Sequence, residues 1–272
     1  MAEAIALIDY GAGNLHSVHN ALIAAGAERV AVTSDPKLVR GARRSSSTRG
    51  KARLSRLQRA SSVAEAIALI DYGAGNLHSV HNALLAAGAE RVAITADPDI
   101  VRGARRVVLP GVGSFKACAD GLTGIPGMVE ALEERVLGGG VPFLGVCVGM
   151  QLLASEGLEH GTTPGLGWIP GEVRIIERTD PAIKVPHMGW NDVSPAPHAR
   201  DGAGLIEPGE AYFLHSYHFR PESGRDVAAM TDHGGGLVAA VARDNIIGVQ
   251  FHPEKSQAYG IALLERFLEW NP

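Results

Sequence analysis

A cysteine between two glycines is the residue of this sequence best suited to nucleophilic chemistry. Gly145-Val146-Cys147-Val148-Gly149 ends the apolar run PFLGVC and leads into VGMQLLAS, which has helical character. A strand that turns sharply into a helix forms a nucleophile elbow, and small residues two positions away permit the tight backbone. The start of the helix also stabilises a thiolate. We therefore predict that Cys147 is a nucleophile.

A second motif offers the base that a nucleophilic cysteine needs. Phe251-His252-Pro253-Glu254 follows the apolar run IIGVQ, so His252 should stand at the carboxyl end of a strand. Cys147 should lie at the same edge of a parallel sheet. Glu254 could accept a hydrogen bond from the other ring nitrogen of His252. A histidine alone is more often structural, so this motif gains its weight from Cys147.

A third motif, PGVG at 110–113, ends another apolar run. Its backbone N–H groups could form one half of an oxyanion hole, and the N–H of Val148 would form the other half. Taken alone, PGVG is explained equally well as a simple turn at the end of a strand.

The elements that must position these motifs follow one pattern in the first half of the domain. Short apolar runs alternate there with helical segments, which predicts an α/β fold with a mostly parallel central sheet and helices on both faces. The expected strands are 67–72, 91–95, 106–111 and 142–147, and the expected helices start at Asn76 and span 148–155.

The second half follows a different pattern. Its strand-like runs lie close together with turn residues between them, which indicates an antiparallel β portion. These runs are 173–176, 211–219, 226–230, 237–243 and 246–251. A last helix follows Ser256, which we expect to be its N-cap, and places Ile261, Leu264 and Leu268 on one face.

Composition narrows the class of protein. The 272 residues are 46% hydrophobic and 20% charged, which is typical of a globular chain with one large domain or two small ones. No apolar run reaches the roughly 18 residues of a membrane helix, and the N-terminus does not resemble a secretory signal. Two cysteines cannot form a disulfide framework. We therefore expect a soluble protein of the reducing cytoplasm.

The chain repeats its own beginning. Residues 1–44 recur at 63–106 with six differences. Residues 1–62 carry ten Lys/Arg and four Asp/Glu, whereas the remainder is acidic and a poor candidate for binding nucleic acid. We interpret the basic segment 45–63 as a solvated linker, although an arm for nucleic acid or an anionic surface, or an error in the sequence, also fits. This divides the chain into a partial duplicate with a basic linker at 1–62 and a working domain at 63–272.

Taken together, the motifs resemble a known family. GVCVGMQ, FHPE and PGVGSF look like the motifs of class I (triad-type) glutamine amidotransferases, which have a flavodoxin-like α/β fold. IDYGAGNLHSV at 70–80, PHMGWN at 186–191 and YFLHSYHF at 212–219 narrow the resemblance to the glutaminase subunits of imidazole glycerol phosphate synthase. The resemblance covers 63–272, with the motifs in the order typical of the family.

The resemblance implies an enzyme with hydrolase and lyase activity that needs neither cofactor nor metal ion. Such a subunit hydrolyses L-glutamine to glutamate and ammonia. A cyclase subunit uses the ammonia to form imidazole glycerol phosphate and AICAR in histidine biosynthesis. The implied assembly is a cytoplasmic heterodimer with ammonia channelling, without nucleic-acid or membrane partners.

The resemblance also implies roles for individual residues. In the implied triad, Cys147 attacks the glutamine amide, His252 transfers protons and Glu254 orients His252. The residues that match oxyanion-binding and substrate-binding positions are Gly113, Val148, Gln151, Glu159, Ser216 and Tyr217. The residues that match positions at the interface with the cyclase are Met188, Trp190, Asn191, Tyr212 and Lys255.

Three other interpretations stay open at this point. The glutaminase partner of pyridoxal phosphate synthesis shares the triad, although HMGWN and HSYH argue against it. A different cysteine hydrolase or a chaperone-like protein could have the same elbow, although Gln151 and Glu254 favour the amidotransferase. A non-enzymatic scaffold, made inactive by its extra N-terminus, is the third.

Overall fold

The computed structural model describes residues 4–8, 29–33, 66–178, 180, 183–197 and 202–272. It divides into two units, which separate after Ser55, and the linker expected at 45–63 lies outside the described residues. In the first unit, β1 (Ala4–Ile8) pairs in parallel with β2 (Arg29–Thr33), and Ile5 lies opposite Val30. In the second unit, β3 (Ile67–Ile70) and β4 (Val92–Thr95) pair with the equivalent register, Ile67 opposite Val92.

A nine-stranded sheet forms the centre of the described part of the second unit, in the order β11-β10-β13-β14-β15-β6-β5-β3-β4. Five of its strands are parallel: β3, β4, β5 (Arg106–Gly111), β6 (Phe143–Cys147) and β15 (Ile246–Val249). The other four continue it antiparallel: β14 (Gly236–Arg243), β13 (Val227–Asp232), β10 (His187–Pro195) and β11 (Gly209–His215). The predicted parallel core with an antiparallel second half is therefore confirmed.

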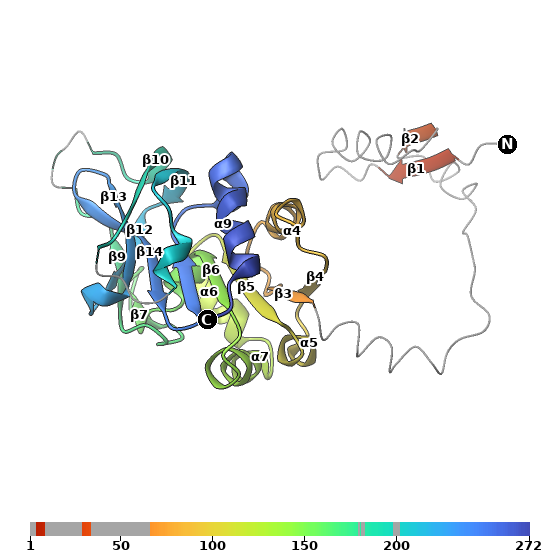
Figure 1. The fold of residues 1–272 in the computed structure, drawn as a ribbon, viewed down its shortest axis with the longest axis horizontal. Coiled ribbons are helices and arrows are strands. Elements are labelled where there is room, and N and C mark those ends of the chain that lie inside the picture. The colour runs from red at the N-terminus through yellow and green to blue at the C-terminus, as the bar shows by residue number, and fades with distance from the viewer. Residues whose placement is uncertain (1–3, 9–28, 34–65, 179, 181–182, 198–201) are drawn as a thin grey trace. The chain divides into compact units, whose positions relative to one another are not determined.

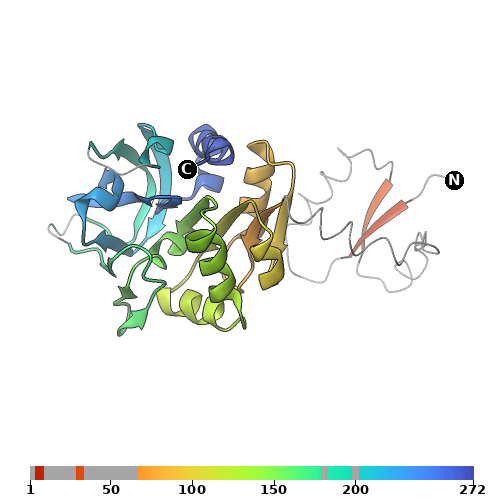
Figure 2. The ribbon, with the colours of Figure 1, turned by 60° about the horizontal axis from the view of Figure 1, so that its bottom comes forward.

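Helices cover both faces of the parallel half, as Figures 1 and 2 show. One face carries α4 (Leu77–Ala86) and α9 (Gln257–Glu269), which pack together. The other carries α5 (Pro98–Arg102), α6 (Phe115–Thr123), α7 (Met128–Leu132) and the π-helix η1 (Glu133–Gly138). Strands covered on both sides must be apolar throughout, and Leu69, Val108 and Leu144 are fully buried.

Two expected elements are shorter than the sequence indicates. The helix expected over 148–155 ends early, since α8 spans only Val148–Gln151. The carbonyl groups of residues 152–155 instead accept hydrogen bonds from the N–H groups of residues 165–167 and 169, which draws the chain out of the helix. The run 211–219 is not one strand, because β11 ends at His215 and β12 (Tyr217–Pro221) belongs to a second sheet.

That second sheet is small and has the order β12-β9-β7-β8 among the described residues. Its other strands are β7 (Glu156–Gly157), β8 (Thr163–Pro164) and β9 (Gly171–Ile175). The remaining described elements are short 3₁₀ turns: η2 (Ala203–Leu205), η3 (Gly224–Asp226) and η4 (Pro253–Lys255). Ser216 is the crossing point between the two sheets, and its carbonyl oxygen accepts from the N–H of Ile176 at 2.9 Å.

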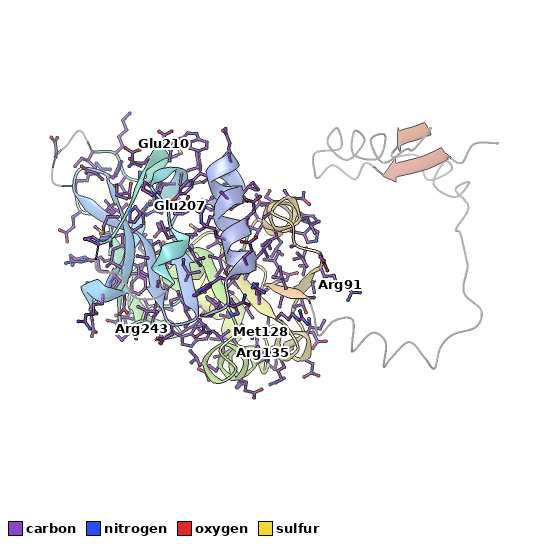
Figure 3. The ribbon with its side chains drawn as sticks, viewed as in Figure 1. Arg91, Met128, Arg135, Glu207, Glu210 and Arg243 are labelled. Carbon is purple, nitrogen blue, oxygen red and sulfur yellow. The ribbon has the colours of Figure 1, made fainter. Side chains whose placement is uncertain are left out.

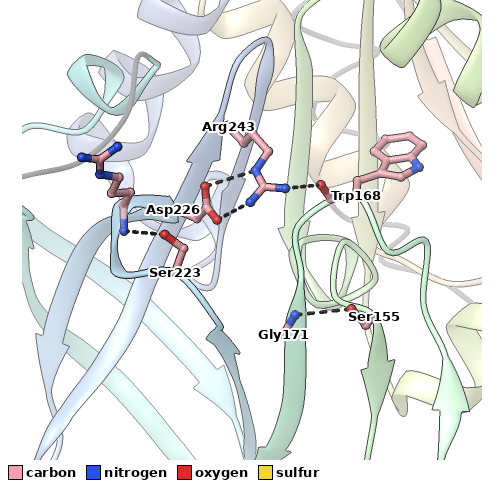
Figure 4. Close-up of polar contacts among 7 residues, drawn as sticks. Ser155, Trp168, Gly171, Ser223, Asp226 and Arg243 are labelled. Carbon is pink, nitrogen blue, oxygen red and sulfur yellow. Dashed lines mark hydrogen bonds and ion pairs between the residues drawn. The ribbon is translucent and has the colours of Figure 1, made fainter.

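A buried ion pair ties this region to the large sheet (Figure 4). Arg243, at the end of β14, donates to both carboxylate oxygens of Asp226 at 3.1 and 2.5 Å, and to the carbonyl oxygen of Trp168 at 3.2 Å. The side chain of Asp226 is fully buried, and the bidentate contact with Arg243 offsets the loss of its hydration.

Arg135 and Met128 belong to η1 and α7, on one face of the parallel half (Figure 3). Arg135 of η1 donates from Nε to the carbonyl oxygen of Ala104 at 2.6 Å, and Met128 of α7 is fully buried.

No helix in the described part of the chain is long and apolar enough to span a membrane.

Candidate active site

The backbone turns sharply at Cys147, between β6 and α8. Cys147 has φ 54° and ψ −111°, a conformation that a residue with a side chain rarely adopts. Glycines make the turn possible, because a Cβ atom at Gly149 would lie 1.8 Å from the carbonyl oxygen of Leu109. A Cβ atom at Gly145 would lie 2.6 Å from the carbonyl oxygen of Gly149. The geometry is that of the nucleophile elbow expected from the sequence.

His252 follows β15, which lies beside β6 in parallel, so the structure places it at the same sheet edge as Cys147. Its Nδ1 lies 2.9 Å from Oε1 of Glu254, and both side chains are almost completely buried. Ser256 secures this turn by donating to the carbonyl oxygen of His252 at 2.7 Å and accepting from the N–H of Tyr212 at 3.0 Å. Ser256 is the N-cap residue of α9, as expected, but its hydroxyl forms these bonds and makes no capping hydrogen bond to the helix.

Charge pairing determines the protonation of His252. Burial alone lowers the pKa of His252, but hydrogen bonds and charge attraction from Cys147 and Glu254 outweigh that effect and raise the pKa to about 9. This pKa keeps His252 an imidazolium at neutral pH, in the cavity that Cys147 also lines. A thiolate beside an imidazolium combines a nucleophile with a proton donor for the leaving group.

The PGVG segment approaches the elbow from β5. The hydroxyl of Tyr72 donates to the carbonyl oxygen of Pro110 at 2.5 Å, and Cys118 Sγ donates to that of Val112 at 3.4 Å. Gly113 has φ +98°, a conformation that favours glycine. Gly113 and Val148 line the same cavity as Cys147, as the oxyanion interpretation requires.

That cavity has a volume of about 320 Å³. The four residues expected to hold the substrate all line the cavity: Gln151, Glu159, Ser216 and Tyr217. Lys255, which was expected at the partner interface, lines it as well. Four further residues that line the cavity were not expected from the sequence: Val112, Pro186, Leu214 and His215. Glu159 also fixes the start of α6, since its Oε2 accepts from the N–H of Phe115 at 2.7 Å.

Gln250 is a further residue that the sequence analysis missed. It is fully buried, and its Nε2 lies 3.7 Å from Sγ of Cys147. Gln151 Nε2 donates to Gln250 Oε1 at 3.0 Å, which joins a cavity-lining residue to the nucleophile. The signal for Gln250 was its polar side chain at the end of the apolar run IIGVQF, directly before His252.

Four of the five residues expected at a partner interface lie together. Met188 and Trp190 are 65% and 46% exposed on one face of β10, and Trp190 packs edge-on against Tyr212 with ring centroids 6.1 Å apart. Lys255 Nζ lies 5.8 Å from the centre of the Tyr212 ring. Asn191 is the exception, because adjacent strand residues point to opposite faces and its amide turns inward to His187.

Comparison with known proteins identifies the family of this chain. Residues 68–270 match the family described as "Glutamine amidotransferase class-I". The chain belongs to this family. Among the relatives of this amidotransferase, the imidazole glycerol phosphate synthase subunit HisH of Zymomonas mobilis is 59% identical over 208 residues, 76% of this chain and 96% of that protein. The HisH subunit of Caulobacter vibrioides is 53% identical, over 76% of this chain and 100% of that protein.

Solved structures support the fold. A crystal structure of a glutamine amidotransferase matches with a TM-score of 0.58 at 20% identity, over 74% of this chain and 97% of that chain. The PurLQS structure from Thermotoga maritima matches with a TM-score of 0.54 at 16% identity, over 75% and 97% of the two chains. At these identities the likeness shows the fold alone.

The protonation of His252 can be measured directly. We expect its imidazole to stay protonated at neutral pH and to lose its proton near pH 9. In Glu254→Gln the midpoint should move to lower pH, because the carboxylate that favours the imidazolium is gone. Nitrogen-15 NMR of histidine-labelled protein measures both midpoints, with His252→Asn identifying the signal. An ordinary midpoint near 6.5 in the wild type, or equal midpoints in the two proteins, would contradict this assignment.

Proposed function

We propose that this amidotransferase hydrolyses L-glutamine to glutamate and ammonia, and supplies the ammonia to the cyclase subunit of imidazole glycerol phosphate synthase in histidine biosynthesis. The observation that carries the proposal is the 59% identity to a HisH subunit, almost the whole of which is matched. The names of the relatives argue against the glutaminase of pyridoxal phosphate synthesis, and the raised pKa of His252 in the cavity of Cys147 argues against a non-enzymatic scaffold.

In the proposed first half-reaction, the thiolate of Cys147 adds to the side-chain amide carbon of glutamine. The carbonyl oxygen becomes an oxyanion, which the backbone N–H groups of Gly113 and Val148 would bind. The imidazolium of His252 then gives its proton to the amide nitrogen. The C–N bond breaks, ammonia leaves, and a glutamyl thioester remains on Cys147.

In the second half-reaction, His252 is neutral and can accept a proton. It takes one from a water molecule as that water attacks the thioester carbon, and the C–S bond breaks. Glutamate is released, and the thiolate–imidazolium pair forms again. Glu254 keeps the ring of His252 in one orientation throughout, while Gln151 and Tyr217 would lie against the amino-acid end of the substrate.

The cavity adjoins the exposed face of β10 and β11. Leu214 and Lys255 line the cavity, and the same two residues border the exposed face formed by Met188, Trp190 and Tyr212. We propose that the cyclase binds this face in the cytoplasm, so that ammonia passes into the partner without entering bulk water. The lyase step then belongs to the two-subunit complex, and the hydrolase step belongs to this chain.

The nucleophile is tested by removing its sulfur. Cys147→Ala should lower glutamate release by about a thousandfold or more, because no other group can form the thioester. The assay contains the cyclase and its nucleotide ligand, since we expect the chain alone to be weakly active. Cys118→Ser is the matched control, because its hydroxyl can still donate to the Val112 carbonyl and activity should persist. Wild-type rates in Cys147→Ala would refute the mechanism.

The partner face is tested by truncating its apolar side chains. Trp190→Ala and Met188→Ala should each weaken binding to the cyclase, by about tenfold or more for the tryptophan. Ile175→Ala is the control, since Ile175 is a 53% exposed apolar residue on a different sheet. Titration calorimetry measures the affinities. Equal affinities for Trp190→Ala and Ile175→Ala would place the interface elsewhere.

We further propose that 63–272 is the working domain and that the partial duplicate with its linker at 1–62 is dispensable. The family match begins at residue 68, and the matched relatives are covered almost completely by 76% of this chain. A chain that begins at Val63 should therefore keep the melting temperature and the ligand-stimulated glutamate release of the full chain. A shortened chain that unfolds, or that folds without activity, would make the first copy part of the working domain.

A further inference from the structure

A row of hydrogen-bonded polar groups runs inward from β10. Asn191 Nδ2 donates to His187 Nε2 at 3.0 Å and to the carbonyl oxygen of Asp232 at 2.7 Å. His187 Nδ1 lies 3.0 Å from His215 Nε2. His215 Nδ1 lies 2.9 Å from the carbonyl oxygen of Tyr217, a residue that lines the cavity. This half of the row joins β10 to the substrate cavity.

The other half reaches the nucleophile. Gln151 Nε2 donates to the same Tyr217 carbonyl oxygen at 2.9 Å and to Gln250 Oε1 at 3.0 Å. Gln250 Nε2 lies 3.7 Å from Sγ of Cys147, which is within hydrogen-bonding range of sulfur. Both glutamines are buried, so neither amide can exchange its partners for bulk water. The two halves meet at the carbonyl oxygen of Tyr217.

The hydrogen positions along the row are determined. Burial lowers the pKa of His187 to about 4 and that of His215 to about 3, so both rings are neutral near pH 7. The carbonyl oxygen of Tyr217 can only accept, so His215 carries its hydrogen on Nδ1 and accepts on Nε2. His187 must then donate from Nδ1 and accept on Nε2, where Asn191 donates. Each junction therefore pairs one donor with one acceptor.

The same reasoning fixes the amide of Gln151. Its two hydrogens point to Tyr217 and Gln250, so its oxygen is left as an acceptor on a residue that lines the cavity. Gln250 accepts from Gln151 through its oxygen and thus turns its N–H group toward Cys147. An N–H donor at the sulfur stabilises the thiolate and holds it in one position.

The outer end of the row lies on a strand with two different faces. Met188 and Trp190 point to the exposed side of β10, whereas His187 and Asn191 point inward. Since these residues alternate along one backbone, a displacement of β10 moves the exposed side chains and the start of the row together.

We propose that Asn191, His187 and His215 are positioning residues, which act through Gln151 and Gln250 on the reacting sulfur of Cys147. The position of β10 thereby sets the reactivity of the nucleophile. This inference deepens the proposed function and rests on it for the identity of the substrate. The hydrogen-bond row itself is a property of the free chain, so it can be tested without glutamine or the cyclase.

The test measures how fast iodoacetamide alkylates Cys147 in the full chain at pH 7.5, with the modified residue located by peptide mass spectrometry. Gln250→Met removes the donor at the sulfur. His187→Leu breaks the row on β10, whereas His187→Asn keeps an amide N–H near the position of Nδ1. His233→Leu is the matched control, because the ring of His233 stacks on His187 at 4.1 Å but has no hydrogen bond in the row.

We expect Gln250→Met to slow alkylation by about tenfold, and His187→Leu to slow it by several-fold. His187→Asn should recover most of the loss, and His233→Leu should stay within about twofold of the wild type. A merely structural role predicts a different pattern, in which His187→Leu and His233→Leu lower the melting temperature while the alkylation rate is unchanged. Wild-type alkylation in folded His187→Leu and Gln250→Met would overturn the proposal.

Asn191→Leu replaces Gln250→Met if the latter does not fold, because Asn191 lies at the outer end of the row and is only half-buried. A slower alkylation there supports the row, and an unchanged rate counts against it. Glutamate release, measured separately with the cyclase and its nucleotide ligand present, distinguishes the two proposals, since a wild-type complex without glutaminase activity would refute the function and leave the alkylation result standing.

Discussion

The strained turn at Cys147 is the constraint on which the rest of the structure depends. A non-glycine residue at φ 54° costs of the order of 1–3 kcal/mol, and it persists only where the surroundings leave the chain no alternative. Here β5, β6 and α8 approach one another so closely that a Cβ atom at Gly111 would lie 2.6 Å from the backbone nitrogen of Gly149. The parallel half of the sheet, buried under helices on both faces, is rigid enough to maintain that contact. The sulfur is thereby presented at the sheet edge, where the cavity opens.

The second constraint is electrostatic. An imidazolium that is almost completely buried loses its hydration, and it is stable only with opposite charge beside it. Glu254 is hydrogen-bonded to His252, and interactions with Glu254 and Cys147 raise the pKa of His252, so the groups of the proposed triad stabilise one another. The turn from β15 into α9 places His252 and Glu254 at the sheet edge where β6 ends in Cys147. Ser256 stabilises this turn by donating to the carbonyl oxygen of His252 and accepting from the N–H of Tyr212 in β11. The active site therefore depends on both halves of the large sheet, the parallel strands for the nucleophile and the antiparallel strands for the anchor of its base.

Much of this architecture could be predicted from the sequence because the signals are local. Apolar runs bounded by turn residues indicate the parallel strands, and glycines around Cys147 indicate the elbow. Strand β10 was not predicted, since its pattern is unusual: His187 is buried and Trp190 is exposed. That pattern makes sense only beside β11, where His215 completes the hydrogen bond to His187. The break at Ser216 has a similar cause, because β11 pairs with β10 before it and β12 pairs with β9 after it, and the run 211–219 alone contains neither partner.

The repeated beginning of the chain separates what a segment specifies alone from what it needs from its context. Strands β1 and β2 adopt the same parallel register as β3 and β4, so the pairing of these two strands is encoded within the repeat. The repeat ends at Arg106, the first residue of β5, so it does not contain the rest of the next pairing, in which Leu69 lies opposite Val108 and β5 joins the sheet. Either copy offers almost the same apolar surface for that position, so burial barely distinguishes them. Loop closure distinguishes them weakly, at about 0.6 kcal/mol for each doubling of the connecting length. The second copy runs directly into β5, and this short connection favours it as the part of the sheet that supports the PGVG segment.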